Sequence, residues 1–203
     1  MKRSAEAPER LGLFGGTFDP PHVGHVTVAA DVADALALDV VLWMPAATSP
    51  FKADERATDP ALRLEMCRAA AAVDPRFRVR DDEIRRGGVS YTVDTLRRLR
   101  GEVGPRVRLY LILGADQLAS FGEWKDPAEI LRLATPAVMD RAGSEAGEVA
   151  PDLPGMERAV HVPVRRVDVS STRVRERVAA GDDVGELVPG GVLEIIRREG
   201  LYR

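Results

Sequence analysis

Two of the three histidines in this chain lie three residues apart, in the stretch GGTFDPPHVGH at residues 15–25. His22 and His25 can point the same way from one helical turn, because side chains with this spacing are neighbours on a helix. The stretch follows a short apolar run and precedes an Ala-rich helical pattern, so we expect it between a strand and a helix. Ligands bind there in open α/β sheets, and a helix start favours an anion. Imidazoles that donate hydrogen bonds at such a point suit a phosphate.

The glycines of this stretch support the same interpretation. Gly15 and Gly16 allow a tight turn and let a ligand approach the backbone. We expect Gly24 to leave room where a side chain would block a flat ring. The GxGxxG fingerprint and the GxxxxGK[ST] pattern are both absent, so this is a different phosphate-binding device. Capping or surface histidines are the structural alternative.

A second stretch, DVSSTRVRE at residues 168–176, also suits a polyphosphate. Its hydroxyl residues, Ser170 to Thr172, are good candidates for a helix N-cap, and an ordinary capped helix is the alternative. Arg173 and Arg175 follow directly, although a cation at a helix N-terminus typically costs about 0.3–1 kcal/mol. A bound polyphosphate would reverse that penalty, because hydroxyls, free N–H groups and a guanidinium would then surround it.

The elements that position these stretches alternate between strands and helices. We predict strands at 11–14, 40–44, 77–80, 107–113, 137–139 and 160–164, and helices at 26–38, 61–73, 92–100, 127–134, 170–181 and 190–202. We expect little structure in the polar, Gly-rich stretch 141–154. The alternation predicts an α/β fold with a doubly wound, mostly parallel sheet flanked by helices. We expect a ragged N-terminus at residues 1–10 and a single domain over 11–203.

Composition limits the possible functions. The 203 residues are 45% hydrophobic and 30% charged, with a formal net charge of −3, which indicates a globular core and no general nucleic-acid or membrane surface. The single cysteine, Cys67, allows no intrachain disulfide and is expected to be a small buried hydrophobe. The N-terminal segment has no apolar region typical of a secretory signal, so we expect a cytoplasmic protein.

GGTFDPPHVGH and VSSTRVR resemble the two signature motifs, HxGH and SSTxxR, of the nucleotidyltransferase α/β phosphodiesterase superfamily. Four further stretches narrow the resemblance: VSYTVDTL (89–96), LGADQ (113–117), FGEWKDPAEI (121–130) and GLYR (200–203). Together they resemble the bacterial nicotinate-nucleotide adenylyltransferase family from residue 11 to the end of the chain. The order and spacing of several separate motifs make this resemblance specific.

The resemblance implies a Rossmann-like nucleotidyltransferase fold and an enzyme of NAD biosynthesis. Its substrates would be ATP and nicotinate mononucleotide, and its products nicotinate adenine dinucleotide and pyrophosphate. Mg²⁺ would arrive with ATP, and we find no residue cluster with the spacing of a metal site. We expect no nucleic-acid or membrane partner, and a homo-oligomer is possible.

The resemblance also assigns roles to individual residues. It implies that His22, His25 and Arg175 act in catalysis at the ATP phosphates, and that Ser171 and Thr172 help to hold the β- and γ-phosphates. Asp116 is expected near the ATP ribose. The expected lining of the passage where the two nucleotides meet is Gly15, Gly16, Thr17 and Phe18.

The acceptor nucleotide would contact Thr17, Lys52, Thr92 and Trp124. An aromatic residue such as Trp124 can stack on a pyridine ring, although it could instead anchor the core. The N–H groups near Thr92 could bind a carboxylate. One departure from the family pattern is Phe51, which stands where a histidine is usual, whereas Lys52 is retained.

Three alternatives stay open at this point. Another HxGH adenylyltransferase would use nicotinamide mononucleotide or pantetheine phosphate as acceptor. A cytidylyltransferase would keep the same histidine motif. A non-catalytic nucleotide-binding module would need fewer phosphate donors than this chain carries.

Overall fold

A six-stranded parallel sheet forms the centre of the described part of the chain. The structure, a computed structural model, describes residues 8–50, 57–141 and 151–203. The strands are β1 (Arg10–Gly16), β2 (Val40–Pro45), β3 (Phe77–Val79), β4 (Arg108–Gly114), β5 (Thr135–Arg141) and β6 (Val160–Val164). Their order is β3-β2-β1-β4-β5-β6 and every neighbouring pair is parallel. The predicted doubly wound parallel sheet is confirmed, and the strand order reverses between β1 and β4.

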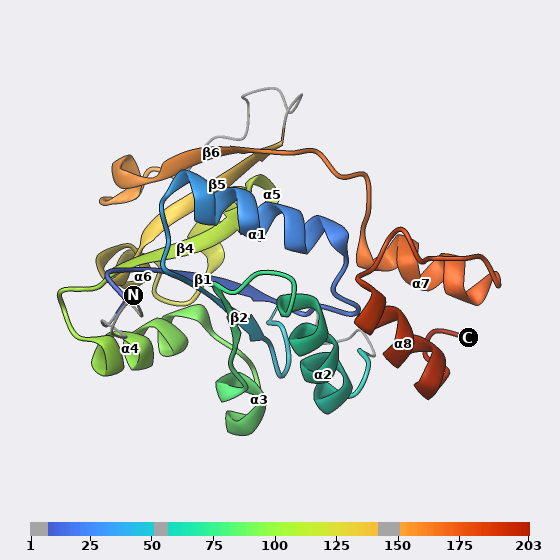
Figure 1. The fold of residues 1–203 in the computed structure, drawn as a ribbon. Helices are drawn as coiled ribbons and strands as arrows, with labels where there is room; N and C mark the ends of the chain where they lie inside the picture. The colour runs from blue at the N-terminus through green and yellow to red at the C-terminus, as the bar shows by residue number, and fades with distance from the viewer. Residues whose placement is uncertain (1–7, 51–56, 142–150) are drawn as a thin grey trace, which may run out of the picture.

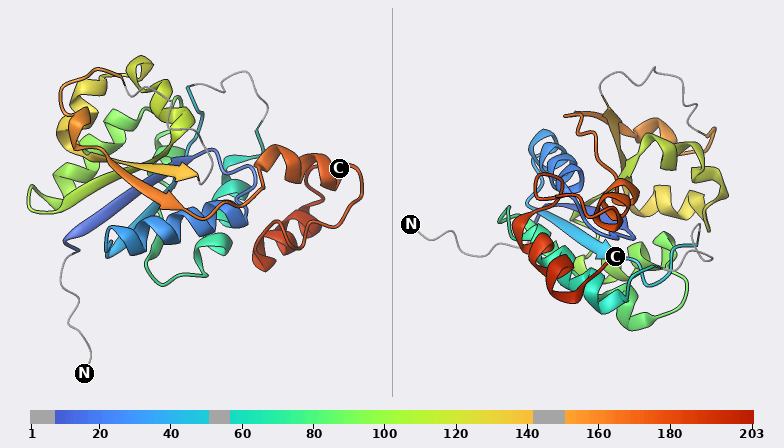
Figure 2. Two further views of the ribbon diagram at one scale, coloured as in Figure 1. Left: turned by 90° about the horizontal axis from the view of Figure 1, so that it is seen from above. Right: turned by 90° about the vertical axis from the view of Figure 1, so that its right-hand side faces the viewer.

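Helices cover both faces of this sheet (Figure 1). They are α1 (Val23–Ala35), α2 (Pro60–Ala71), α3 (Asp82–Arg86), α4 (Thr92–Val103), α5 (Ala115–Ala119), α6 (Pro127–Leu133), α7 (Ser171–Ala179) and α8 (Gly190–Glu199). Buried residues of α1, α2, α7 and α8 share one hydrophobic cluster, and those of α4, α5 and α6 share the other. Figure 2 shows α7 and α8 side by side beyond one end of the sheet. Within the described residues, no helix combines the length and apolar character needed to cross a membrane.

The strands divide their side chains between the two clusters, as the period of two along a strand requires. On β2, Trp43 packs towards α1 and α2, whereas Leu42 and Met44 pack towards α4. On β4, Ile112 belongs to the first cluster and Leu111 to the second. These strands are apolar at nearly every position because both faces of the sheet are covered.

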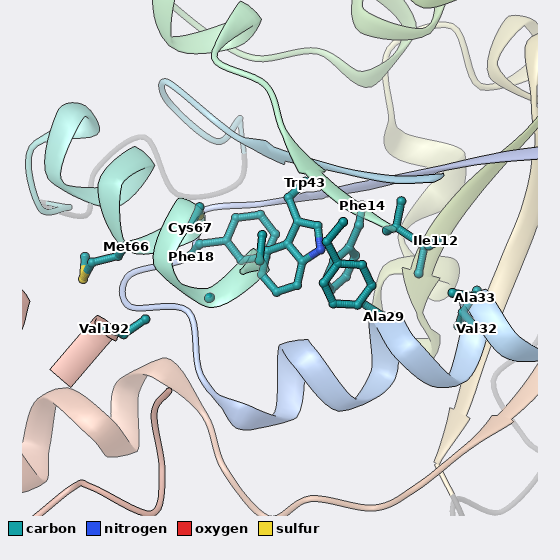
Figure 3. Close-up of a cluster of buried hydrophobic side chains, with 14 of the residues drawn as sticks. Phe14, Phe18, Ala29, Val32, Ala33, Trp43, Met66, Cys67, Ile112 and Val192 are labelled. Atoms are coloured by element: carbon teal, nitrogen blue, oxygen red, sulfur yellow. The ribbon is translucent and has the colours of Figure 1, made fainter. Parts of the chain in front are cut away.

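An aromatic group forms the centre of the first cluster (Figure 3). The ring of Phe18 stacks on Trp43 at 5.2 Å, and Phe14 meets both rings edge-on. Trp43 and Cys67 are buried, as predicted. The side chain of Phe18 is also buried. Its backbone has a φ of 51°, which directs the ring into the core from the loop that borders the site.

The predicted elements are present, with differences in their bounds and two additional short α-helices. Helix α1 begins at Val23 rather than at residue 26, so the histidines belong to its first turn. Helices α3 and α5 were not predicted, because five residues are too few to show a helical period. The last helix ends at Glu199 because Gly200 adopts a left-handed C-cap. Of the polar stretch 141–154, Arg141 ends β5, and residues 142–150 lie outside the described residues.

The segment before α7 packs closely against the start of α1. A Cβ atom built on Gly24 would lie 2.9 Å from Cγ1 of Val169 and 3.0 Å from Nδ1 of His22. The space beside Gly24 is therefore filled by the protein itself and is not open to a ligand ring, contrary to the expectation from the sequence. Gly24 therefore lies at the contact between two segments that are far apart in the sequence.

We expect Gly24→Ala to lower the free energy of unfolding by about 1–3 kcal/mol, because the added methyl group overpacks this junction. The matched control is Gly101→Ala in α4, where a Cβ meets nothing within 4 Å. That control should raise stability by about 1 kcal/mol through helix propensity. Thermal or urea unfolding measures both variants. A Gly24→Ala protein as stable as the wild type would contradict the close packing.

Candidate active site

Two adjoining cavities open at the carboxyl edge of the sheet, where the strand order reverses. The first, which we call the histidine cavity, has a volume of about 700 Å³ and contains His22, His25 and Arg175 in its wall. The second, the tryptophan cavity, has a volume of about 330 Å³ and contains Thr92 and Trp124. Both cavities share Gly16, Thr17, Ser49 and Gln117. Two ligands bound in these cavities would therefore meet beside the loop after β1.

The two histidines cap α1 and hold each other in place. His22 is the N-cap, and its Nδ1 accepts a hydrogen bond from the backbone N–H of His25 at 3.3 Å. The Nδ1 of His25 accepts from the backbone N–H of His22 at 3.2 Å. The rings are stacked, with centroids 3.7 Å apart, and His22 is only 7% exposed. Since a backbone N–H only donates, a neutral ring here carries its proton on Nε2 and donates from that atom.

The capping geometry combines the two interpretations of the histidines. They are structural caps, as the alternative suggested, and they also line the larger cavity. His25 packs edge-on against Phe18, with ring centroids 5.1 Å apart. The buried Phe18 ring therefore supports an imidazole, and Phe18 is itself among the residues that line the cavity.

The N-terminus of α7 faces the histidines across the same cavity. Ser170 is the N-cap and accepts from the backbone N–H of Arg173, while the Ser171 hydroxyl donates to the Pro20 carbonyl at 2.9 Å. Arg175 donates to the Asp19 carbonyl at 2.8 Å and to the Thr172 hydroxyl at 3.3 Å. Residues more than 150 positions apart are thus brought into one wall.

The two arginines of this helix differ in their surroundings. Arg173 points to Asp168, to which it donates at 2.9 Å, so its charge is offset within the protein. Arg175 lies in the second turn rather than the first, and its long side chain runs back to the helix start and into the cavity wall. Of this pair, Arg175 is the one that lines the cavity.

Helix α5, which directly follows β4, contributes part of the wall of the histidine cavity. Asp116 lines this cavity, and its contact with a ribose stays a prediction. Gln117, which the sequence analysis did not select, lines both cavities, and its side-chain oxygen accepts from the Gly114 backbone N–H at 3.0 Å. The motif LGADQ contains both residues, but only the fold shows that Gln117 lies at the junction.

The tryptophan cavity combines an aromatic wall with a helix start. Trp124 is half-buried and packs against Phe121 at 5.2 Å while it lines the cavity, so it both anchors and faces the site. Thr92 begins α4, and the N-cap residue Tyr91 makes no side-chain cap. Lys125 lies 4.5 Å from the Tyr91 ring centre. The predicted acceptor residue Lys52 and its neighbour Phe51 lie outside the described residues.

A buried carboxyl group supports the turn before α4. Glu83 accepts a 2.5 Å hydrogen bond from the Thr95 hydroxyl, and burial raises the pKa of Glu83 above its usual value. Ser90 ties the same turn to the loop after β2, because its hydroxyl oxygen accepts from the Ala47 N–H at 3.1 Å. Glu83 was not predicted as a site residue, because no local sequence pattern marks it.

Arg63 of α2 is a buried cation that the sequence analysis also missed. It is 1% exposed and donates to the carbonyls of Thr58, Thr17, Ala46 and Ala47 at 2.7–3.1 Å. Desolvation lowers its pKa, and the nearby Asp19 opposes that effect. Its spacing of four from Cys67, on the apolar face of α2, was the signal available in the sequence. Arg63 clamps the loops after β1 and β2, which form the walls between the cavities.

The described residues contain no group of three or more His, Cys, Asp or Glu side chains placed to hold a metal ion. The carboxylates in the histidine cavity are Asp19 and Asp116. This donor set fits an ion that keeps phosphate and water ligands, as Mg²⁺ commonly does.

Comparison with known proteins defines the class. The family described as cytidylyltransferase-like matches residues 13–177, so this chain is a nucleotidyltransferase of the cytidylyltransferase-like family. Within that class, it belongs to the nicotinate-nucleotide adenylyltransferase family, as its sequence relatives show. The resemblance inferred from the motifs is confirmed.

Two relatives illustrate the match. The chain is 39% identical to a protein of Chromobacterium violaceum, with 96% of this chain and 99% of the relative covered. It is 42% identical to a protein of a Roseiflexus species, with 95% and 98% covered. Both are named probable nicotinate-nucleotide adenylyltransferase.

A solved structure shares the fold. Nicotinic acid mononucleotide adenylyltransferase of Plasmodium falciparum, complexed with NaAD, superposes with a TM-score of 0.75. The alignment covers 96% of this chain and 97% of that one at 15% identity. The Rossmann-like architecture is therefore confirmed.

We expect Arg63→Met to lower the free energy of unfolding by about 3 kcal/mol, because buried carbonyls lose their donors. Arg63→Lys should recover part of this loss, since a compact ammonium cannot reach every carbonyl that the guanidinium does. The control is Arg68→Met, an exposed position on the same helix, with a change below about 1 kcal/mol. Urea unfolding compares the three variants. Equal losses for Arg63→Met and Arg68→Met would exclude the clamp.

Proposed function

We propose that this enzyme transfers AMP from ATP to nicotinate mononucleotide and releases pyrophosphate, forming nicotinate adenine dinucleotide for NAD biosynthesis. The names of its relatives support this reaction. The carrying observation is that the two cavities share the wall formed by Gly16 and Thr17. ATP in the histidine cavity and the acceptor in the tryptophan cavity would have their reacting phosphates next to each other.

The proposed chemistry is an in-line displacement at the α-phosphorus of ATP. A 5′-phosphate oxygen of the acceptor forms the new P–O bond, and the bond from the α-phosphorus to the bridging oxygen breaks. The electron pair leaves with pyrophosphate. The nucleophile is already an anion, so no general base is required, and catalysis consists of positioning and charge neutralisation.

The chain's own residues would supply that neutralisation. His22 and His25 would donate from Nε2 to phosphate oxygens, since their Nδ1 atoms are occupied by the helix cap. Arg175, Ser171 and Thr172 would hold the β- and γ-phosphates, and Asp116 the ribose. Mg²⁺ bound to ATP would supply further positive charge at the phosphates.

The acceptor end would be selected by the tryptophan cavity. Trp124 offers an aromatic face for the pyridine ring, and the N–H groups at the start of α4 would bind the nicotinate carboxylate. Lys52 is a further acceptor contact in this proposal. A cytoplasmic location, a homo-oligomeric state, a single domain over residues 11–203 and the lack of nucleic-acid or membrane partners stay predictions.

We expect pyrophosphate release with ATP to be fastest for nicotinate mononucleotide among candidate acceptors. Nicotinamide mononucleotide should give a kcat/KM at least about 100-fold lower, because its amide NH₂ would face donors placed for a carboxylate. A coupled pyrophosphate assay with these two acceptors and pantetheine phosphate measures kcat/KM for each of the three. Equal values for the two pyridine nucleotides would exclude the carboxylate site. ATP binding without turnover of any acceptor would favour a non-catalytic module.

We expect His25→Gln to lower kcat by more than about tenfold with little loss of stability. A glutamine at this third helical position can still accept from the His22 N–H, so it keeps the capping box without the imidazole. His25→Ala removes both functions and should also lower the melting temperature. Steady-state kinetics and thermal unfolding separate the two effects. Unchanged kcat in His25→Gln would restrict His25 to a capping role.

A further inference from the structure

The end of the chain folds back onto Asp19, a residue of the histidine cavity wall. After α8, Gly200 and Tyr202 both adopt positive φ angles, of 61° and 64°. The Leu201 N–H donates to the Ile196 carbonyl at 3.0 Å, which closes the helix end. A left-handed conformation is uncommon for a bulky aromatic residue, so the surroundings must hold Tyr202 there. GLYR was among the motifs of the sequence, but the proposed reaction gives it no role.

Tyr202 reaches the loop of the first motif. Its hydroxyl donates a 2.6 Å hydrogen bond to Oδ1 of Asp19, 183 positions earlier in the chain. Asp19 is only 7% exposed, and its Oδ2 accepts from the Thr58 N–H at 3.0 Å. Burial and the adjacent carboxylate raise the pKa of Tyr202, so the hydroxyl stays a donor. Both carboxylate oxygens of Asp19 therefore have donors from the protein.

Asp19 connects this contact to the phosphate-binding residues. Its backbone carbonyl accepts from Arg175 at 2.8 Å, and Asp19 itself lines the histidine cavity. Freed of one donor, the Asp19 carboxylate could instead pair with the Arg175 guanidinium, which is already in contact with the same residue.

We propose that Tyr202 is a positioning residue for the triphosphate of ATP. Its hydroxyl engages the Asp19 carboxylate, so that this carboxylate does not pair with the Arg175 guanidinium. Arg175 then keeps its hydrogen bond to the Asp19 carbonyl and its place in the cavity wall. This inference rests on the proposed function for the identity of the ligand as a nucleoside triphosphate. Tyr202 acts through Asp19 and Arg175 and makes no contact with the reacting atoms.

The test compares Tyr202→Phe with Tyr110→Phe. Tyr110 lies in the middle of β4, so the control also removes one hydroxyl from a tyrosine, away from the carboxyl edge of the sheet. We expect Tyr202→Phe to raise the Kd of a non-hydrolysable ATP analogue about three- to tenfold, the size of one lost charge-assisted hydrogen bond acting indirectly. The KM for nicotinate mononucleotide should change less than twofold, and Tyr110→Phe should leave both values unchanged.

A double-mutant cycle separates positioning from a general structural effect. In an Arg175→Ala background, Tyr202→Phe should cause no further rise in the Kd, because its effect passes through Arg175. The same fold-change in both backgrounds would overturn the proposal. Tyr202→Phe could instead lower the melting temperature strongly and weaken the binding of both substrates equally. That result would show that Tyr202 is a structural anchor, and it would also overturn the proposal. The Kd of the ATP analogue is measured without an acceptor and without turnover. It therefore tests the role of Tyr202 even if the proposed adenylyl-transfer reaction is wrong, and the turnover assay tests that reaction separately.

Discussion

The site depends on one set of contacts, between the loop after β1 and the N-terminus of α7. Ser171 donates to the Pro20 carbonyl and Arg175 to the Asp19 carbonyl, and Val169 packs on Gly24 just beside them. Without these contacts, the histidines and the guanidinium would lie on separate parts of the chain. A nucleoside triphosphate needs several donors at once, because its charge is spread over many oxygens. In the proposed reaction the junction supplies these donors from two segments, and the small volume of Gly24 permits the approach of the segments.

Several polar groups of the cavity wall and its support are engaged by hydrogen bonds within the protein itself. His22 and His25 cap each other, Arg63 satisfies carbonyls of two loops, and Asp19 receives Tyr202. Donors that are already oriented need little reorganisation when charge develops during transfer. The same engagement makes the buried charges tolerable, since an unpaired charge in this position would be strongly destabilising. In the proposed mechanism, several of these residues therefore combine a structural role with a functional one.

Much of the architecture was predictable from local patterns. Apolar strands separated by amphipathic helices indicated the parallel sheet, and the strands β1, β2 and β4 were recognisable because both faces are buried. The short helices α3 and α5 were missed because five residues cover less than two turns. The positive φ of Phe18 and the burial of its ring could not be read from the sequence, because a sequence pattern does not report that angle. Arg63 and Glu83 were missed because their partners come from other elements.

The chain's motifs were sufficient to indicate phosphate chemistry, the α/β class and the family, because residue type and short-range spacing express helix starts, caps and donors directly. They did not reveal that Gln117 lies where the two cavities meet, that Gly24 is packed against Val169, or that Tyr202 returns to Asp19. Those relations join positions up to 183 residues apart. They arise only when the order of the strands brings distant loops to one edge of the sheet, which no local pattern encodes.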